Sequence, residues 1–282
     1  MRSPEESLAD RDMVRALAAA LGLTFVEAAI SAREQRGNME AQCRMLRYRA
    51  LETMAEANGC PLVATGHHGD DQLETMLMRL MRGAGVRGLA GIAGSRTLGD
   101  GEVILVRPML GVSHGDAIRI CTIAGQAWCE DVTNTGKGRM RGAIRHEIVP
   151  RLKAVCPKIL DHAAASSRLL ADTGDVVRGL ARRIVSGADW ECDEEHEHDE
   201  IILVRAELRL QPAPVLGEVL LLARASLLGS AGASRLKGEE INKAIACIRS
   251  DSTDPKKLLI AGMKVEVTAH EVRAGHASNS PG

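Results

Sequence analysis

The chain has 282 residues, which is enough for two domains that each bury a core of their own. Its formal net charge of -1 neither indicates nor excludes a nucleic-acid partner, so the local distribution of charge has to decide. Aromatic residues make up only 1% of the chain, which excludes base stacking as the main mode of any nucleic-acid contact.

The seven cysteines form no C-x-x-C pair, and the sequence shows neither a signal peptide nor an apolar run long enough to cross a membrane. Disulfides and clustered cysteine ligands are therefore not expected. These features predict a reduced, cytoplasmic protein with no membrane segment and no zinc or iron–sulfur site.

The first part of the chain predicts alternating helices and strands. Apolar residues at helical spacing indicate a helix over 10–21, which Gly22 ends. Residues 23–30 are typical of a strand, and a long helix over 39–58 follows Asn38 as its N-cap.

The long helix carries Arg44, Arg47, Tyr48 and Leu51 on one surface, because steps of three and four residues bring side chains together. Two arginines therefore point the same way. An ordinary charged helix face is the simpler interpretation of them.

The central stretch predicts a strand, a turn and a helix. The apolar run 61–64 stops at a Thr-Gly turn, and two histidines and two aspartates precede the next helix. In that helix Leu73, Met76, Leu77 and Leu80 recur at helical spacing, which predicts a buried stripe.

One of the two aspartates has a structural explanation, because an N-cap carboxylate accepts hydrogen bonds from the first backbone N–H groups. Asp70 or Asp71 is the predicted N-cap. The other aspartate lies with Glu74, His67 and His68 at the carboxyl end of a strand, where open α/β sheets bind ligands. This cluster is a candidate site, and a solvated acidic helix start beside surface histidines is the alternative.

A second strand over 103–106 is closed by proline and leads to a helix over 115–124. The order strand, helix, strand, helix indicates a parallel sheet built from crossover units. Residues 83–88 match G-x-G-x-x-G but follow a helix, so they do not indicate dinucleotide binding. They predict a flexible glycine loop that carries Arg82 and Arg87.

The strongest local basic signal follows, and it consists of Lys137, Arg139, Arg141, Arg145 and Arg151. Arg141 and Arg145 are four residues apart at a helix start, so their guanidinium groups could clamp phosphate oxygens bidentately. A solvated basic helix explains the same residues equally well.

The remainder predicts a connector and a second unit. An alanine-rich helix over 158–186 is the connector, and the acidic run 189–200, with His196 and His198, is a surface loop or domain boundary whose histidines are more simply solvated than metal-bound. The elements expected after it are a strand 201–204, helices 214–228 and 238–248, and a strand pair 257–260 and 263–268. This unit contains no chemical cluster, which favours a role in recognition or packing.

Several of these motifs resemble the tRNA(Ile)-lysidine synthase family. The resemblance is collinear over residues 1–152 and continues weakly into the last unit. It rests on His67-His68-Gly69-Asp70-Asp71-Gln72-Leu73-Glu74-Thr75, its continuation Arg79 to Gly91, Asn38-Met39-Glu40-Ala41 with Arg44, Arg47 and Tyr48, Arg107-Pro108-Met109-Leu110, Glu130-Asp131 with Thr133-Asn134, Arg141 to Pro150, and the glycine hairpin of Leu259 to Val267.

The resemblance implies an α/β fold. A parallel-sheet domain of the N-type ATP pyrophosphatase type, adenine nucleotide α hydrolase-like and Rossmann-like, would be followed by a helical connector and a small α+β domain. The implied parts are a catalytic domain 1–155, a connector with its acidic loop 156–200, a substrate- or tRNA-recognition domain 201–275 and a disordered tail 276–282.

The resemblance also implies a two-step ligation that uses ATP and Mg²⁺. ATP adenylates the C2 oxygen of the wobble cytidine in a CAU-anticodon tRNA(Ile) and releases pyrophosphate. The ε-amine of free L-lysine then attacks C2 and expels AMP. The tRNA and L-lysine are the implied partners, and a homodimer is left open.

Residue roles follow from the same resemblance. Asp71 and Glu74 would hold Mg²⁺ or orient the lysine ammonium, since both cations prefer carboxylate oxygens. His67 and Arg47 would stabilise charge on the activated phosphate. The other implied roles are catalysis and phosphate binding by Arg141, cofactor binding by His67, Asp70 and Arg145, and RNA binding by Arg79, Arg82, Arg87, Lys137 and Arg139.

One family motif does not occur in this sequence, namely the phosphate-binding loop serine-glycine-glycine-x-aspartate-serine that follows the family's first strand. Met1 onward resembles a segment well inside the family's first domain, so we expect the catalytic domain to lack that strand and loop. Gly142 stands where the family usually has asparagine.

Two alternatives remain open at this point. One is a catalytically inactive tRNA-binding remnant of the family, which the basic segment permits. The other is a different tRNA-modifying ATPase of the same fold, such as a tRNA thiolase, although the absence of C-x-x-C pairs argues against it.

Overall fold

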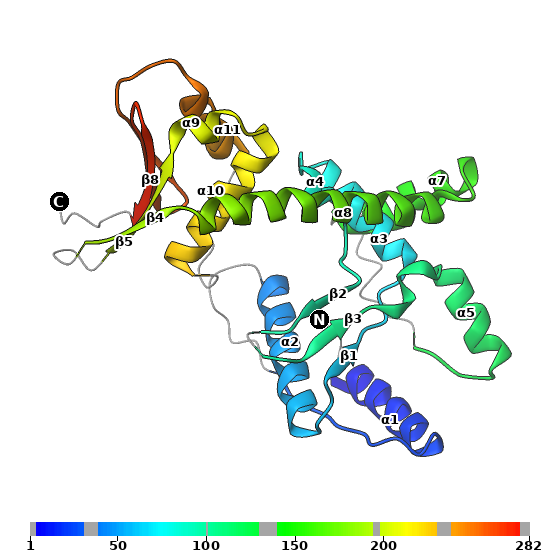
Figure 1. Ribbon diagram of the computed structural model, residues 1–282. Helices are drawn as coiled ribbons and strands as arrows, with labels where there is room; N and C mark the ends of the chain where they lie inside the picture. Colours follow the sequence, from blue (N-terminus) through cyan, green and yellow to red (C-terminus); the bar gives the residue numbers. More distant parts are fainter. Residues whose placement is uncertain are drawn as a thin grey trace. The chain divides into compact units, whose positions relative to one another are not determined.

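A computed structural model describes residues 4–30, 39–99, 101–129, 140–193, 198–229 and 238–276 (Figure 1). The chain divides into two compact units, Met1–Ala171 and Asp172–Gly282. The division falls inside one long helix, α8 (Ile159–Ser186). Within the described residues, no helix is both long and apolar enough to span a membrane.

Unit 1 alternates helices with short strands. Its elements are α1 (Pro4–Ala20), α2 (Met39–Ala57), β1 (Leu62–Ala64), α3 (Gly69–Leu80), α4 (Val86–Leu89), β2 (Ser95–Thr97), β3 (Ile104–Val106), the 3-10 helix η1 (Pro108–Gly111), α5 (His114–Ile123), α6 (Met140–Ala143), the π-helical turn η3 (Ile144–Ile148), α7 (Val149–Val155) and the start of α8. The helices predicted over 39–58 and 115–124 are confirmed as α2 and α5.

The sheet of unit 1 has the order β1-β3-β2 (Figure 1). β1 and β3 are parallel, with Leu62 opposite Ile104 and Ala64 opposite Val106. This pairing confirms the predicted parallel sheet. β2 joins β3 in the antiparallel direction, and the sequence pattern misses it because its three residues, Ser-Arg-Thr, show no apolar alternation.

The prediction of a strand over residues 23–30 is wrong. These residues have no regular secondary structure and belong to neither of the sheets that the described residues form. An extended segment becomes a strand only when a neighbouring strand exchanges ladder hydrogen bonds with it. The apolar pattern of a segment does not supply that neighbour.

Two small apolar cores hold unit 1 together. One joins α2 to the sheet and consists of Ala55, Leu98, Val103 and Leu105. The other joins α3 to η3, α7 and α8 and consists of Leu73, Ile144, Val149 and Ala163. The second core fixes α3 beside η3, which determines where the charged groups of both elements meet.

Helix α3 differs from its prediction at both ends. Its N-cap is His68 rather than an aspartate, and the backbone N–H of His68 donates to Asp71 Oδ2 at 3.1 Å. Leu80, which was expected in the buried stripe, is 60% exposed. It is the last residue of the helix and lies beyond the turns that pack on the core.

Unit 2 is built on a five-stranded antiparallel sheet in the order β4-β5-β8-β7-β6. Its elements after α8 are β4 (Asp189–Asp193), β5 (His198–Val204), α9 (Arg205–Arg209), α10 (Ala213–Leu228), α11 (Gly238–Arg249), β6 (Lys256–Ile260), β7 (Met263–Val267) and β8 (Glu271–His276). Alternate residues of β7 are buried in a core to which α10 and α11 contribute. The predicted strand pair at the C-terminal end is confirmed as β6 and β7.

The acidic run 189–200 is not a surface loop in its described part. Asp189–Asp193 forms β4 and pairs with β5, with Asp189 opposite Ile202. β4 is an edge strand of this sheet. Residues 194–197, which include His196, lie outside the described residues.

Candidate functional site

The candidate site lies at the carboxyl end of β1, where a short turn connects this strand to α3. The parallel strands β1 and β3 end at the same edge, and the backbone N–H of Thr65 donates to the carbonyl of Val106 at 3.0 Å. The first turns of α3 therefore bring Asp70, Asp71 and Glu74 to this edge.

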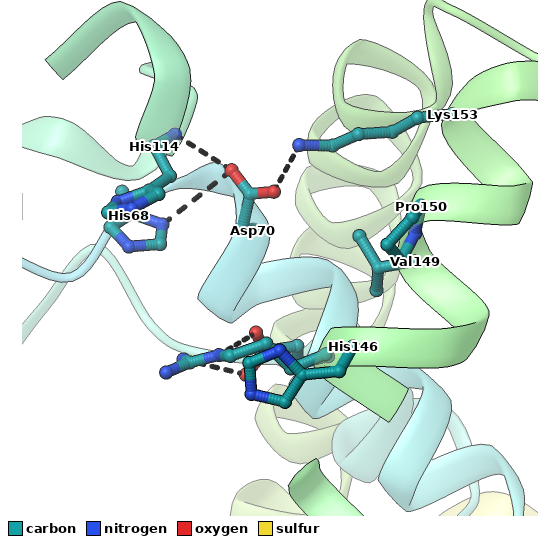
Figure 2. Close-up of a pocket in the computed structure, with 9 residues that line it drawn as sticks. His68, Asp70, His114, His146, Val149, Pro150 and Lys153 are labelled. Carbon is teal, nitrogen blue, oxygen red and sulfur yellow. Dashed lines mark hydrogen bonds and ion pairs between the residues drawn. The ribbon is translucent and has the colours of Figure 1, made fainter. Parts of the chain in front are cut away.

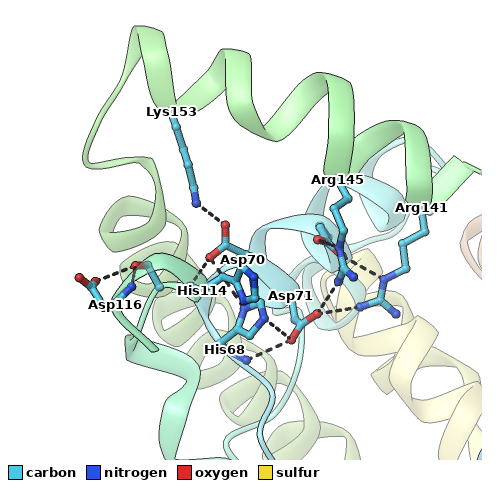
Figure 3. A network of polar contacts seen from close by, with 10 residues as sticks. His68, Asp70, Asp71, His114, Asp116, Arg141, Arg145 and Lys153 are labelled. Carbon is cyan, nitrogen blue, oxygen red and sulfur yellow. Dashed lines mark hydrogen bonds and ion pairs between the residues drawn. The ribbon is translucent and has the colours of Figure 1, made fainter. Parts of the chain in front are cut away.

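A charged cluster occupies the centre of the site (Figure 3). Glu74 Oε1 accepts a hydrogen bond from Arg145 Nε at 2.6 Å, and Glu74 Oε2 accepts from Arg141 Nε and Arg145 Nη2, each at 3.0 Å. Asp71 Oδ1 accepts from Nη2 of both arginines, at 3.2 Å from Arg141 and 3.0 Å from Arg145. Two carboxylates on α3 thus face two arginines on α6 and η3.

The burial of Glu74 makes its pairing with the two arginines necessary. Glu74 is only 1% exposed, and an ionised carboxylate is stable in such a place only when cations and hydrogen bonds compensate it. The hydrogen bond with Glu74 is also the main cause that raises the pKa of Arg145. The predicted phosphate clamp of Arg141 and Arg145 is therefore occupied by carboxylates in this structure.

The same geometry bears on the predicted metal site. Both oxygens of Glu74 and Oδ1 of Asp71 face guanidinium groups, and Asp71 Oδ2 accepts from the His68 backbone. In the part of the chain that the structure describes, no group of three or more histidine, cysteine, aspartate or glutamate side chains could hold a metal ion. This arrangement does not fit Mg²⁺.

Asp70 connects three helices. Its Oδ2 accepts from the backbone N–H of His114 on α5 at 2.8 Å, and its Oδ1 accepts from Lys153 Nζ on α7 (Figure 2). Burial acts to raise the pKa of Asp70, but the bonds from His114 and Lys153 outweigh it and hold the pKa below its usual value. These contacts give Asp70 a structural role, and its predicted cofactor contact stays a prediction.

A cavity of about 330 Å³, which we call the histidine cavity, lies beside Asp70 (Figure 2). The rings of His68 and His114 lie 5.2 Å apart, centroid to centroid. The residues that line the cavity are His68, Asp70, Glu74, His114, Arg145, His146, Val149, Pro150 and Lys153. Its size suits a small molecule.

A second cavity, of about 530 Å³, lies between α2 and the turn after β1, and we call it the arginine cavity. The residues that line it are Cys43, Arg44, Arg47, Tyr48, Leu51, Thr65, Gly66, His67, Asp71 and Arg141. The predicted common surface of Arg44, Arg47, Tyr48 and Leu51 is thus confirmed. Four predicted catalytic residues, Arg47, His67, Asp71 and Arg141, line this one space.

His67 is held in a defined orientation by Thr65, whose Oγ1 lies 2.9 Å from Nδ1 of the ring. Burial lowers the pKa of His67, and Arg107 lowers it further, while Asp71 acts in the opposite direction. The ring is therefore neutral at pH 7. If the Thr65 hydroxyl donates to Nδ1, the proton of His67 is on Nε2.

The residues with predicted RNA contacts have different surroundings. Arg79 Nη1 donates to the carbonyls of Gly88 and Gly91 at 2.7 and 2.5 Å, so at least this nitrogen stabilises the glycine-rich segment. Arg82 and Arg87 are exposed. Lys137 and Arg139 lie outside the described residues.

The glycine-rich segment, which was expected to be a loop over residues 83–88, is helical in its second half. It contains α4, and buried Gln72 holds its end: the Gln72 side chain accepts from the Ile92 N–H at 2.7 Å and donates to Ser167 of α8. Gly91 has a φ of +71°, and a side chain there would collide with Gln72. The segment is therefore packed against α3 and α8.

Several residues of the site escaped the sequence analysis. Thr65 orients His67, and His114 and Lys153 fix Asp70, but no spacing in the sequence marks them. Their partners lie as many as 83 residues away in the chain, as Lys153 and Asp70 show. Only the packing of α5 and α7 against the start of α3 brings them together.

An α/β domain that gathers arginines, carboxylates and a histidine where parallel strands end belongs to the class of domains that bind ligands at this edge. Comparison with protein families identifies the family within this class. Residues 2–152 match the model of the PP-loop domain, an ATP-binding domain, and the chain belongs to that family.

Curated relatives agree with this membership. The chain is 43% identical over 152 residues to a tRNA(Ile)-lysidine synthase from Salinispora arenicola, covering 53% of this chain and 45% of the relative. It is 32% identical over 232 residues to a tRNA(Ile)-lysidine synthase from Symbiobacterium thermophilum, covering 80% and 48%. The chain thus spans about half the length of these relatives.

Among solved structures, a U34-tRNA thiolase from Methanococcus maripaludis is similar with a TM-score of 0.48 and 14% identity. The similarity covers 57% of this chain and 56% of that one.

Proposed function

We propose that this protein is a tRNA(Ile)-lysidine synthase, which uses ATP to join free L-lysine to C2 of the wobble cytidine of a CAU-anticodon tRNA(Ile). The observation that carries the proposal is the arginine cavity, where Arg47, His67, Asp71 and Arg141 converge at the carboxyl ends of parallel strands. The membership in the PP-loop domain family and the similarity to enzymes of this name support it.

In the first step, ATP adenylates the C2 oxygen and pyrophosphate leaves. Arg47 offers positive charge to the phosphate that is attacked, because it is exposed on the wall of the cavity and forms no ion pair among the described residues. Neutral His67 donates a hydrogen bond from Nε2 to an oxygen of the same phosphate, and Thr65 keeps the ring in place for it.

In the second step, the lysine ε-amine attacks C2 and AMP leaves. The amine has to be unprotonated when it attacks, and a carboxylate can orient the ammonium beforehand and accept its proton. Asp71 takes this role, since it lies on the wall of the arginine cavity while Glu74 is buried behind it. Arg141 exchanges its bond with Asp71 for one with the phosphate, so that Asp71 Oδ1 keeps its bond from Arg145 and can also accept from the amine.

Transfer of labelled lysine to a CAU-anticodon tRNA(Ile) transcript tests the proposal. Asp71→Asn keeps the size of the side chain and removes its charge, so lysine transfer should fall by about 100-fold or more while tRNA still binds. The matched control is Asp116→Asn, which changes a carboxylate on the exposed face of α5 and should leave transfer unchanged.

The test also separates the proposal from its main alternative. ATP-dependent transfer by the native protein supports a synthase. Tight tRNA binding by the native protein without any transfer would instead identify a tRNA-binding remnant, and equal transfer by wild type and Asp71→Asn would remove Asp71 from the mechanism.

A further inference from the structure

A third cavity, of about 550 Å³, adjoins the arginine cavity, and we call it the flanking cavity. The residues that line it are Arg44, Met45, Tyr48, Arg49, Glu52, Arg96, Leu98 and Gly99, from α2 and from β2 with the turn after it. Arg44 and Tyr48 belong to the walls of both cavities. The two spaces are therefore neighbours that share one wall.

Three exposed arginines surround Tyr48 at this place. The guanidinium carbon of Arg96 lies over the Tyr48 ring at 4.6 Å from its centroid, and that of Arg44 at 5.3 Å. Arg49 follows Tyr48 directly on α2 and is exposed. The ring orders the two guanidinium groups that stack on it, so less entropy is lost when they bind an anion.

No ion pair among the described residues neutralises the positive charge of this cluster. Within the described residues Arg44, Arg49 and Arg96 form no ion pair, and the hydrogen bonds of Arg44 and Arg96 go to the Tyr48 hydroxyl and the carbonyl of Thr97. Glu52 is the one carboxylate on the cavity wall, and its carboxylate lies against the backbone of Gly99 and Gly101. Arg141 and Arg145, by contrast, are neutralised by carboxylates.

We propose that Arg44, Arg49 and Arg96 bind the phosphodiester backbone of single-stranded RNA next to the nucleotide that enters the arginine cavity. Guanidinium groups bind phosphate oxygens bidentately, and exposed arginine planes also stack on unpaired bases. A free nucleotide would be contained in the arginine cavity. In a polynucleotide, the neighbouring nucleotides of the same strand would extend beyond that cavity. The shared wall makes the flanking cavity the adjoining space for that continuation.

This inference rests on the proposed function for the identity of its ligand, but its test requires no catalysis. The probe is a fluorescent CAU anticodon stem-loop, whose affinity for the full chain is measured by anisotropy over a series of salt concentrations without ATP or lysine. The test variant is the double substitution Arg49→Ala and Arg96→Ala. Arg119→Ala on α5 is the control, because that side chain is 79% exposed and equally basic.

The double variant should bind the stem-loop roughly 10-fold more weakly at about 0.1 M salt, because two phosphate contacts are lost. The slope of log affinity against log salt should become shallower by about 1.4, which corresponds to two contacts at about 0.7 each for single strands. Arg96→Lys keeps the charge but not the stacked guanidinium, so it should keep the salt slope of the wild type, which excludes misfolding as the cause of the loss. The control should match the wild type.

Unchanged affinity and slope in the double variant would overturn the inference, and so would an equal loss in Arg119→Ala. A variant that loses affinity for AMP or pyrophosphate but keeps its affinity for the stem-loop would assign the cluster to a small anion instead. Lysine transfer distinguishes the two proposals. An inactive protein whose binding depends on Arg49 and Arg96 contradicts the proposed function alone, and an active protein whose binding does not depend on them contradicts this inference alone.

Discussion

Two buried charges, one in each unit, are compensated in opposite ways. In unit 1 the buried carboxylate of Glu74 is compensated by two arginine side chains, Arg141 and Arg145, which are 38% and 30% exposed. In unit 2 the guanidinium of Arg205, which is 3% exposed, donates instead to five backbone carbonyls at the end of α11 and beyond, those of Cys247, Ile248, Ser250, Ser252 and Thr268.

This difference separates a charge fixed by the backbone from one that side chains compensate. Backbone carbonyls cannot leave Arg205 without unfolding α11 and the loop after it, so no ligand can compete for this cation. The arginines of unit 1 are side chains that reach solvent. Arg205 therefore stabilises unit 2, whereas the exchange of partners by Arg141 belongs to the proposed mechanism.

The largest effect on stability is expected for Arg205→Met. The substitution fills a similar volume but leaves several buried carbonyls without a donor, so the free energy of unfolding of unit 2 should fall by about 4 kcal/mol. Urea unfolding followed by the fluorescence of Trp190 on β4 measures it, in a Trp128→Phe background that removes the signal of unit 1. Arg209→Ala, at an exposed ion pair with Asp251, should change stability by less than about 0.5 kcal/mol.

A smaller loss of stability is expected for Glu74→Gln, because Arg141 and Arg145 can turn toward water when the carboxylate charge is removed. The free energy of unfolding of unit 1 should fall by about 2 kcal/mol, and lysine transfer should be lost as well. Thermal unfolding and the transfer assay measure the two effects. Glu147→Gln changes an exposed carboxylate of η3 and should affect neither. A stable but inactive Glu74→Gln protein would show that the cluster serves catalysis alone.

The smallest expected effect is on the pH dependence of the stability of unit 1. Because the folded pKa of Asp70 lies below its unfolded value, its contribution to stability is complete above the unfolded pKa and is lost as the pH falls through the folded pKa. Lys153→Met removes one cause of the lowered pKa, so unit 1 should unfold at a higher pH during acid titration, with a cost below about 1 kcal/mol at pH 7. Trp128 fluorescence follows this transition in a Trp190→Phe background, which removes the signal of unit 2. Lys158→Met, at an exposed lysine, should leave the acid midpoint unchanged.

Much of the site was predictable because its parts are local. The stretch from Thr65 to Glu74 predicts a turn and a helix start, and its polar residues do lie at the end of a parallel strand. The surface of Arg44, Arg47 and Tyr48 follows from helical spacing alone. The partners of these groups were not predictable. Arg141 and Asp71 are 70 residues apart, and each looks like an ordinary surface charge in its own segment.

The sequence by itself determined the longer helices, the parallel pair β1 and β3 and the family motifs, because periodicity and glycine stops act over a few residues. Only the tertiary structure decided which charges neutralise one another. It paired Glu74 with Arg145, Asp70 with Lys153 and Arg205 with carbonyls of unit 2. Burial by distant elements sets the cost of each of these charges, and that cost is absent from the local pattern of residues.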